Sequence, residues 1–218
     1  MKPKLLNGEG ILLQVSKAGE GGRRLRLFSR AEGQMTCFAA KGTIKKYGTG
    51  LLFPFAALRY TLALQEYNRI LVQYEGRLPF SVASLSYEEI ARWYYAAEIA
   101  LFVFPEGQAD GDVFFLLQRA TEEAKTRNPT LVAFLLSIKL FAYAGFDPVE
   151  EEPMGVLGLS TPAALLLRAF RFYQWDGQLA EAVSRETFRE CAVYLDDFAE
   201  RYVGIEMKTR GAFADTLN

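Results

Sequence analysis

The sequence of 218 residues contains no histidine and only two cysteines, Cys37 and Cys191, which lie far apart within apolar runs. A structural zinc site needs four sulfur or nitrogen ligands, so we expect no metal and no other cofactor. The lack of histidine also removes the usual general base of a nucleophilic triad. Long apolar runs are missing too, because none reaches membrane-spanning length without a charged or turn residue, and the N-terminus has no apolar core. The sequence therefore predicts a cytoplasmic protein with reduced thiols.

The acidic residues form no recognisable catalytic pattern. The glutamates at 88–89, 122–123 and 150–152 are adjacent in the chain, and adjacent residues on a helix point about 100° apart. The glycine-rich stretch 19–22 lacks the lysine and the following helix of a phosphate-binding loop. We therefore expect a protein that is not an enzyme.

Charge is unevenly distributed along the chain, although the net charge is only -1. Residues 1–77 hold 13 Lys and Arg against 5 Asp and Glu, a balance of +8, and residues 78–218 hold 12 against 21, a balance of -9. Such an asymmetry is typical of a nucleic-acid-facing module joined to a module with another role. An incidental surface composition is the alternative.

Short apolar alternations between glycine turns predict β-strands in the first half. Residues 11–15 alternate, 19–22 supply a turn that tolerates positive backbone angles, and 31–33 favour a hairpin turn before the third strand. Further strands are predicted at 58–65 and 70–74. Five short strands with a longer connection after the third are typical of an OB-type barrel, which binds oligonucleotides, although other small barrels give the same pattern.

The second predicted strand is strongly basic. Successive strand side chains point to opposite faces, so Leu25 and Leu27 share one face. Guanidinium groups that share the other face without an acid between them repel one another, which favours a polyanionic partner over a merely solvated surface. The residues predicted on that face are Arg24, Arg26, Phe28 and Arg30.

A second basic segment follows the third strand. Residues 43–50 show no strand alternation and bring Lys45, Lys46 and Tyr47 together between glycines, shortly after Lys41. We expect an exposed and mobile connection here. Its lysines either contact a polyanion or form only a solvated loop.

From residue 81 the apolar period changes from two to about three and a half, which predicts helices. Each predicted helix begins at a capping residue or at a proline in its first turn. The predicted starts are the capping box Ser86–Glu89, Asp110 or Asp112, Asn128-Pro129, Thr161-Pro162 and Ser184.

The helix predicted at 131–144 is apolar nearly all round, which argues for a central buried helix that stops at Gly145. The predicted architecture is therefore α+β. An OB-fold-like DNA-binding domain at residues 1–80 is followed by a helical bundle domain at residues 81–218.

Five motifs occur in order in the first half: Gly-Ile-Leu-Leu at 10–13, Gly-Glu-Gly-Gly-Arg-Arg-Leu at 19–25, Leu-Phe-Ser-Arg-Ala-Glu-Gly at 27–33, Ala-Lys-Gly at 40–42 and Leu-Phe-Pro-Phe at 52–55. Together they closely resemble the N-terminal domain of the RecO family of bacterial DNA-repair and recombination mediators. The helical half is similar to that family as well, through Ala-Gly-Phe-Asp-Pro at 144–148 and the segment 201–213. The resemblance covers nearly the whole chain.

The sequence departs from that family's pattern at one place. Many RecO proteins carry a four-cysteine zinc-binding insertion after the central helix, whereas residues 149–155 here are short, acidic and free of cysteine. The chain is thus similar to members that lack the zinc module.

The resemblance implies a mediator of DNA repair and homologous recombination that performs no covalent chemistry. Such a protein binds single- and double-stranded DNA, anneals complementary strands and associates with RecR. It helps to load RecA onto strands coated by single-strand-binding protein, whose acidic C-terminal tail it recognises. The location implied is cytoplasmic, with association with the nucleoid during repair.

The residues favour DNA binding independently of the resemblance. Basic side chains neutralise phosphates, and aromatic rings stack on bases, which contributes about 1 to 3 kcal/mol for each stacked base. Phe28, and Phe38 on the third strand, alternatively fill the barrel or its seam with the bundle. The predicted DNA-binding residues are Arg24, Arg26, Phe28, Arg30, Lys41, Lys45, Lys46 and Tyr47.

A basic rim beside an apolar groove of the bundle is the candidate site for the acidic tail of single-strand-binding protein. The candidate residues are Arg119, Lys125, Arg127 and Lys139. Several glutamates occur in the same stretch, and no motif fixes the choice. The alternative function is an adaptor that does not bind DNA and whose basic barrel docks an acidic protein partner.

Overall fold

The computed structural model describes residues 4–66, 68–78, 85–175 and 184–214. The chain divides into two compact units. The first consists of residues 1–84 and 104–126, and the second of residues 85–103 and 127–218. The expected domain boundary between residues 80 and 81 lies outside the described residues.

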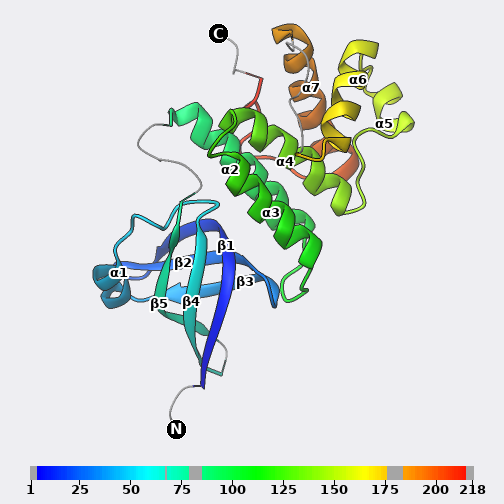
Figure 1. Ribbon diagram of the computed structural model, residues 1–218. Helices are drawn as coiled ribbons and strands as arrows, with labels where there is room; N and C mark the ends of the chain where they lie inside the picture. Colours follow the sequence, from blue (N-terminus) through cyan, green and yellow to red (C-terminus); the bar gives the residue numbers. More distant parts are fainter. Residues whose placement is uncertain (1–3, 67, 79–84, 176–183, 215–218) are drawn as a thin grey trace. The chain divides into compact units, whose positions relative to one another are not determined.

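Five strands of the first unit close into a barrel in the order β1-β2-β3-β5-β4 (Figure 1). Neighbouring strands are antiparallel except β3 and β5, which pair in parallel over a short stretch. A register shift between Leu12 and Gln14 lets the long β1 pair with both β2 and β4. This connectivity confirms the predicted OB-type barrel. The strands are β1 (Lys4–Ala18), β2 (Gly22–Ser29), β3 (Gly33–Ala39), β4 (Ala57–Leu64) and β5 (Arg69–Arg77).

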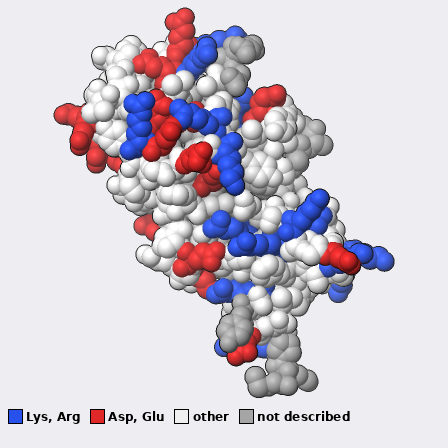
Figure 2. All heavy atoms as spheres, turned by 180° about the vertical axis from the view of Figure 1, so that it is seen from behind, with Lys and Arg blue, Asp and Glu red and all other residues white. Residues whose placement is uncertain are grey.

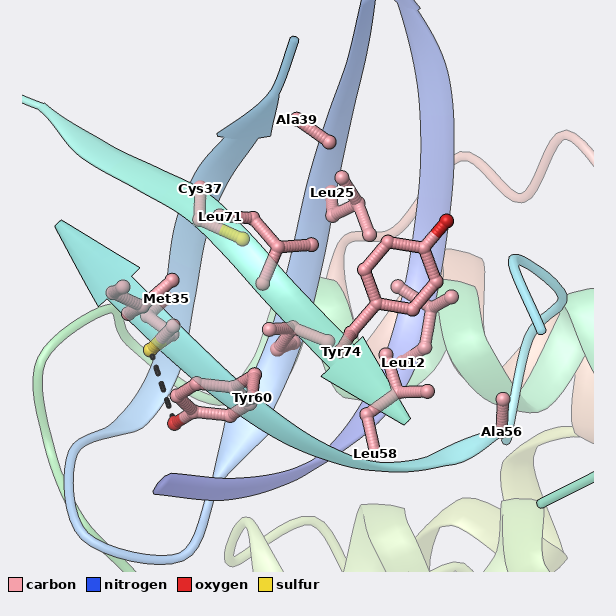
Figure 3. Packing of buried hydrophobic residues seen from close by; sticks show 12 residues of the cluster. Leu12, Leu25, Met35, Cys37, Ala39, Ala56, Leu58, Tyr60, Leu71 and Tyr74 are labelled. Atoms are coloured by element: carbon pink, nitrogen blue, oxygen red, sulfur yellow. Dashed lines mark hydrogen bonds between the residues drawn. The ribbon is translucent and has the colours of Figure 1, made fainter. Parts of the chain in front are cut away.

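Alternate side chains of the strands fill the barrel (Figure 3). Leu25 and Leu27 point inward as predicted and are fully buried. Tyr60 crosses the barrel, and its hydroxyl donates a hydrogen bond to the Ser29 hydroxyl oxygen at 2.9 Å. Burial raises the pKa of the Cys37 thiol to about 12, so this thiol stays protonated at neutral pH. The core leaves the outer faces of the strands available for ligands.

A short helix lies between β3 and β4, which corrects the predicted mobile loop. Helix α1 (Lys41–Tyr47) is followed by Gly48, which has a φ of +79°. Ile44 and Tyr47 pack against the barrel core, and the Tyr74 hydroxyl donates to the Gly48 carbonyl. Two apolar residues three positions apart make one face of a helical turn, which explains why this segment showed no strand period.

Residues 104–126 belong to the compact unit of the barrel, whereas we expected them in the bundle. They comprise a loop at 104–110, called here the 104–110 loop, and helix α3 (Gly111–Glu123). Asp110 caps α3 by accepting a hydrogen bond from the Val113 amide at 3.0 Å, as one of the two predicted starts requires.

The 104–110 loop covers an open edge of β3. Because β3 pairs with β5 only near its end, the backbone around Gln34 has no strand neighbour on that side. The Gly107 amide donates to the Gln34 carbonyl at 2.8 Å, and Gln34 forms a parallel bridge with Glu106. The Phe104 ring meets the Phe28 ring edge-on at 5.9 Å. Backbone pairing and aromatic packing together attach the loop to the barrel.

Gly33 is required for the close approach of this loop. Its φ is +69°, and a Cβ atom there would overlap the carbonyl oxygen of Gln108. Gly33→Ala is therefore expected to lower the free energy of unfolding by about 2 to 3 kcal/mol, through backbone strain and displacement of the loop. Urea denaturation measures this loss.

The matched control is Gly42→Ala in α1, where a Cβ meets no atom within 4 Å. This change is expected to be neutral or to stabilise by up to about 1 kcal/mol. Equal stabilities for Gly33→Ala and the wild type would contradict the importance of the close approach.

The second unit is a helical bundle whose helices begin at predicted capping residues. The Ser86 amide donates to the Glu89 carboxylate at 2.8 Å, and the Glu89 amide donates to the Ser86 hydroxyl oxygen at 3.2 Å, which confirms the capping box. The side chains of Asn128 and Ser184 cap two further helices as predicted.

One helix starts a residue earlier than predicted. Ser160 is the capping residue, and its hydroxyl accepts from the Ala163 amide at 3.4 Å, so Thr161 is already helical.

The acidic stretch after the central helix forms a short helix that was not predicted. The helices of this unit are α2 (Tyr87–Val103), α4 (Pro129–Tyr143), α5 (Glu151–Val156), α6 (Thr161–Phe172) and α7 (Arg185–Phe198), followed by the π-helical turn η2 (Ala199–Val203).

Helix α4 is the buried centre of the bundle, as its apolar sequence predicted. Residues 132–141 are all buried, and the chain turns away after the helix at Gly145, which has a φ of +87°. The C-terminal segment is fastened to the same unit, because the Glu98 carboxylate accepts hydrogen bonds from the amides of Lys208 and Thr209.

Candidate nucleic-acid interface

The outer side of the β2–β3 pair carries the basic residues predicted to bind DNA. The register places Arg24 opposite Phe38 and Arg26 opposite Thr36. Arg24 is exposed, whereas the other three residues are half-buried. These four residues form one surface, called here the β2–β3 face, in which an aromatic ring lies beside a guanidinium group. Such a combination suits both the bases and the phosphates of a single strand.

Further cations gather at the end of the β1–β2 hairpin and on α1. Lys17 lies opposite Arg23 in the hairpin. The Lys41 side chain passes over the turn and lies close to Gly21. A Cβ atom on Gly21 would be only 3.0 Å from Lys41 Cδ. Figure 2 shows Lys and Arg side chains gathered over the barrel. The exposed lysines of this region are Lys17, Lys41, Lys45 and Lys46.

Several of these cations have no acidic partner. Within the part of the chain that the structure describes, Arg24, Lys41 and Lys45 form no ion pair. Burial lowers the pKa of Arg26; the charge of Glu106 raises this pKa, and the charge of Arg24 lowers it further. Arg24 and Arg26 therefore repel each other, and a polyanion on the β2–β3 face would relieve this repulsion.

Two residues predicted on the same face contact the 104–126 segment. Phe28 is fully buried beneath Phe104, so its ring is not open to a base. Arg30 follows the end of β2, with its guanidinium 3.8 Å from the Glu9 carboxylate and 5.5 Å from the centre of the Phe115 ring. The strand ends at Ser29, so its alternation does not reach Arg30, whereas Phe28 keeps the alternation and is covered by Phe104.

Tyr47 is half-buried against the barrel. Its ring centre lies 5.4 Å from that of Tyr74 and 5.0 Å from the Lys46 ammonium nitrogen. The ring thus fixes α1 to the barrel and leaves one cation above it. Lys45 and Lys46 remain exposed on the short helix.

The residues predicted to bind the acidic tail are divided between the two compact units. Arg119 and Lys125 belong to the unit of the barrel, while the other two candidates belong to the bundle. Arg119 pairs with Glu123 at 2.7 Å, and Lys125 pairs with Glu122 at 2.5 Å. Acidic neighbours in the same stretch therefore neutralise both cations.

The two candidates in the bundle are also engaged. The Arg127 guanidinium lies 5.7 Å from the centre of the Tyr173 ring. Lys139 is only 6% exposed, and its ammonium donates to the Arg171 carbonyl at 2.9 Å. The prediction of Lys139 as a surface cation is wrong, because α4 is buried on nearly every side.

Lys139 makes the stability of the bundle depend on pH. Burial, and then the charge of Arg171, lower the pKa of Lys139 to about 8. The unfolded chain keeps the ordinary pKa, near 10.5, so it binds more protons than the folded chain above about pH 8, and the free energy of unfolding rises with pH there. Lys139→Met is expected to stabilise the protein at neutral pH by about 1 kcal/mol and to reduce this rise.

Urea denaturation at about pH 7, pH 8 and pH 9.5 measures the effect, below the range in which tyrosines ionise. The matched control is Lys208→Met, which changes an exposed lysine of the same unit. An unchanged pH dependence in Lys139→Met would show that the buried ammonium does not titrate in this range.

The sequence alone did not single out Thr36, Glu106, Lys17 or Arg23. The hairpin register could have placed Thr36 beside Arg26 once the turn at 31–33 was assumed. Glu106 is 70 residues from Thr36, to which it is hydrogen-bonded, so no local pattern brings them together.

A cavity of 410 Å³ also lies in the barrel unit, lined by residues of β1, β4, β5 and α3. Its charged lining is mixed, with Glu9 and Glu75 beside Arg59 and Arg77. Acids and bases in equal number do not favour a polyanion. The β2–β3 face and α1 are therefore the stronger candidate for DNA.

The described residues contain no group of three or more cysteines, aspartates or glutamates placed to hold a metal ion. Among them, no helix has the length and apolar character needed to cross a membrane.

No family model matches the chain. A curated protein, DNA repair protein RecO of Pelotomaculum thermopropionicum, is 30% identical to it over 152 residues. The chain is homologous to this RecO protein. The aligned part is 68% of this chain and 59% of the RecO relative, so the chain covers less than two thirds of that protein. The relative supports the family resemblance drawn from the sequence motifs, and the barrel followed by helices agrees with it.

Proposed function

We propose that the protein acts in DNA repair and homologous recombination by binding DNA through the β2–β3 face and the lysines of α1. One observation carries this proposal: the exposed Arg24, which forms no ion pair among the described residues, lies opposite the half-buried Phe38, and exposed lysines follow shortly after Phe38 on α1. Cations neutralise phosphates without regard to sequence, and the ring offers a stacking surface to a base. Binding of this kind tolerates any base sequence.

The finer activities are proposed on the relation to RecO. The protein anneals complementary strands, binds both single- and double-stranded DNA, and associates with RecR. It recognises the acidic C-terminal tail of single-strand-binding protein and helps to load RecA onto coated strands. It works as a mediator without covalent chemistry, in the cytoplasm and at the nucleoid during repair.

Fluorescence anisotropy of a labelled single-stranded oligonucleotide tests the proposal. If Arg24, Arg26 and the three lysines at 41–46 each contact a phosphate, log affinity should fall against log salt with a slope of about -3.5. A parallel assay should show that the protein accelerates pairing of complementary strands without degrading them. Failure to bind DNA at about 50 mM salt would contradict the proposal.

The same assay distinguishes the proposed DNA binding from the adaptor alternative. A labelled polyglutamate peptide offers the charge of an acidic protein without bases or sugars. An adaptor binds this peptide and not the oligonucleotide, whereas the proposed DNA-binding protein prefers the oligonucleotide at equal salt.

A further inference from the structure

Two side chains of the β2–β3 face converge on one carboxylate oxygen. The Thr36 hydroxyl donates a hydrogen bond to Glu106 Oε1 at 2.8 Å. The Arg26 Nε lies 4.0 Å from the same oxygen. The donors come from neighbouring strands at opposite register positions, so the strand pairing fixes their spacing. A hydroxyl and a guanidinium that face one oxygen form an oxyanion-binding arrangement.

The backbone of the 104–110 loop holds Glu106 at this place. Glu106 forms the parallel bridge with Gln34, and the next amide, of Gly107, donates to the Gln34 carbonyl. Gln108 lies against Gly33, where no larger residue fits. The position of the carboxylate therefore follows from the fold of the loop.

The ion pair between Arg26 and Glu106 is long and open to water. The Glu106 side chain is 52% exposed, and 4.0 Å from Arg26 is a long ion-pair distance. Exposed pairs of this kind contribute little to stability, so another anion can replace the carboxylate. A phosphate diester shares one negative charge between two oxygens, as a carboxylate does, and it can bind an arginine through two parallel hydrogen bonds, which the 4.0 Å contact with Glu106 does not provide.

We propose that Arg26 and Thr36 form a phosphate-binding subsite, and that Glu106 occupies it in the free protein as an internal substitute for a nucleic-acid phosphate. The subsite rests on the proposed DNA-binding function and adds a specific contact to it. DNA binding displaces the Glu106 carboxylate toward solvent, and a backbone phosphate takes its place between the hydroxyl and the guanidinium. The Glu106 carboxylate therefore also competes with any other acidic ligand for Arg26 and Thr36.

Glu106→Gln tests the subsite. Its amide oxygen keeps an acceptor for Thr36 while the negative charge is lost, so the loop stays in place. The affinity for a single-stranded oligonucleotide should rise about threefold to tenfold at low salt. The slope of log affinity against log salt should become steeper by somewhat less than the contribution of one phosphate contact, because the carboxylate no longer competes with the phosphate.

Glu75→Gln on β5 is the matched control, since it removes the same charge from an exposed position of the same barrel. The double variant Arg26→Gln with Glu106→Gln should lose the gain relative to Arg26→Gln alone. The subsite is wrong if Glu106→Gln binds like the wild type, if Glu75→Gln gains as much, or if the gain survives without Arg26.

The failure of the subsite is distinguishable from the failure of the proposed function. A wild type that binds no oligonucleotide overturns both. A wild type that binds normally, with Glu106→Gln unchanged, overturns the subsite alone.

Discussion

Reversal of two charges, Arg24→Glu with Lys41→Glu, is expected to lower the affinity for a single-stranded oligonucleotide at least about tenfold at moderate salt. Both residues are exposed, and neither forms an ion pair within the described residues, so their charge is available to a polyanion. The variant loses two phosphate contacts and adds two repulsive carboxylates. Its salt slope should shrink by about 1.4, which is the contribution of two contacts to a single strand.

The change should leave the fold intact, because neither side chain belongs to the barrel core. The matched control reverses two exposed cations of the bundle, Arg168→Glu with Lys208→Glu. It alters the net charge equally and should reduce the affinity only slightly. Anisotropy titrations of both variants decide the matter, and equal losses would show that the affinity depends on net charge and does not depend on the barrel surface.

Truncation of one central ring, Phe134→Ala, is expected to lower the free energy of unfolding of the bundle by about 3 to 5 kcal/mol. Phe134 is fully buried on α4. Its ring centre lies 5.8 Å from that of Phe170, 4.7 Å from Phe188 and 5.0 Å from Phe213. One side chain therefore joins α4 to α6, to α7 and to the C-terminal segment. Removal of the ring leaves a cavity between α4, α6, α7 and the C-terminal segment, and these elements cannot all move inward to fill it.

The control Phe172→Ala removes the same ring from α6 where it is 60% exposed, and should change stability by less than about 1 kcal/mol. Urea denaturation followed by circular dichroism measures both variants, with separate transitions fitted for the two units if they appear. The proposed central role of Phe134 would be refuted by losses of equal size.

The barrel and the helix starts could be predicted because their signals are local. Leu25 and Leu27 alternate with arginines, so the inward face of β2 follows from the strand period alone. Ser86 and Glu89 are three residues apart, and their reciprocal hydrogen bonds follow from the capping-box spacing. The length and apolar character of the central helix likewise predicted its burial.

The candidate site was predicted less completely because it depends on contacts between distant residues. Phe28 alternates like the arginines, but Phe104 covers it from 76 positions further along the chain. The contact of Glu106 with Arg26 and Thr36 likewise joins residues that are distant in the sequence. No local pattern predicts that the 104–110 loop lies on β3. Lys139 resembles a surface cation until the other helices enclose α4. Tertiary contacts of this kind override strand and helix periods.

The central claim is that DNA lies on the β2–β3 face, and crosslinking tests it most directly. A single-stranded oligonucleotide that contains 5-iodouracil is irradiated with the protein, and the crosslinked peptides are identified by mass spectrometry. The account predicts crosslinks to Phe38, whose half-buried ring lies opposite Arg24, and to the neighbouring α1 segment. Crosslinks confined to the bundle, at residues 85–103 and 127–214, would contradict it.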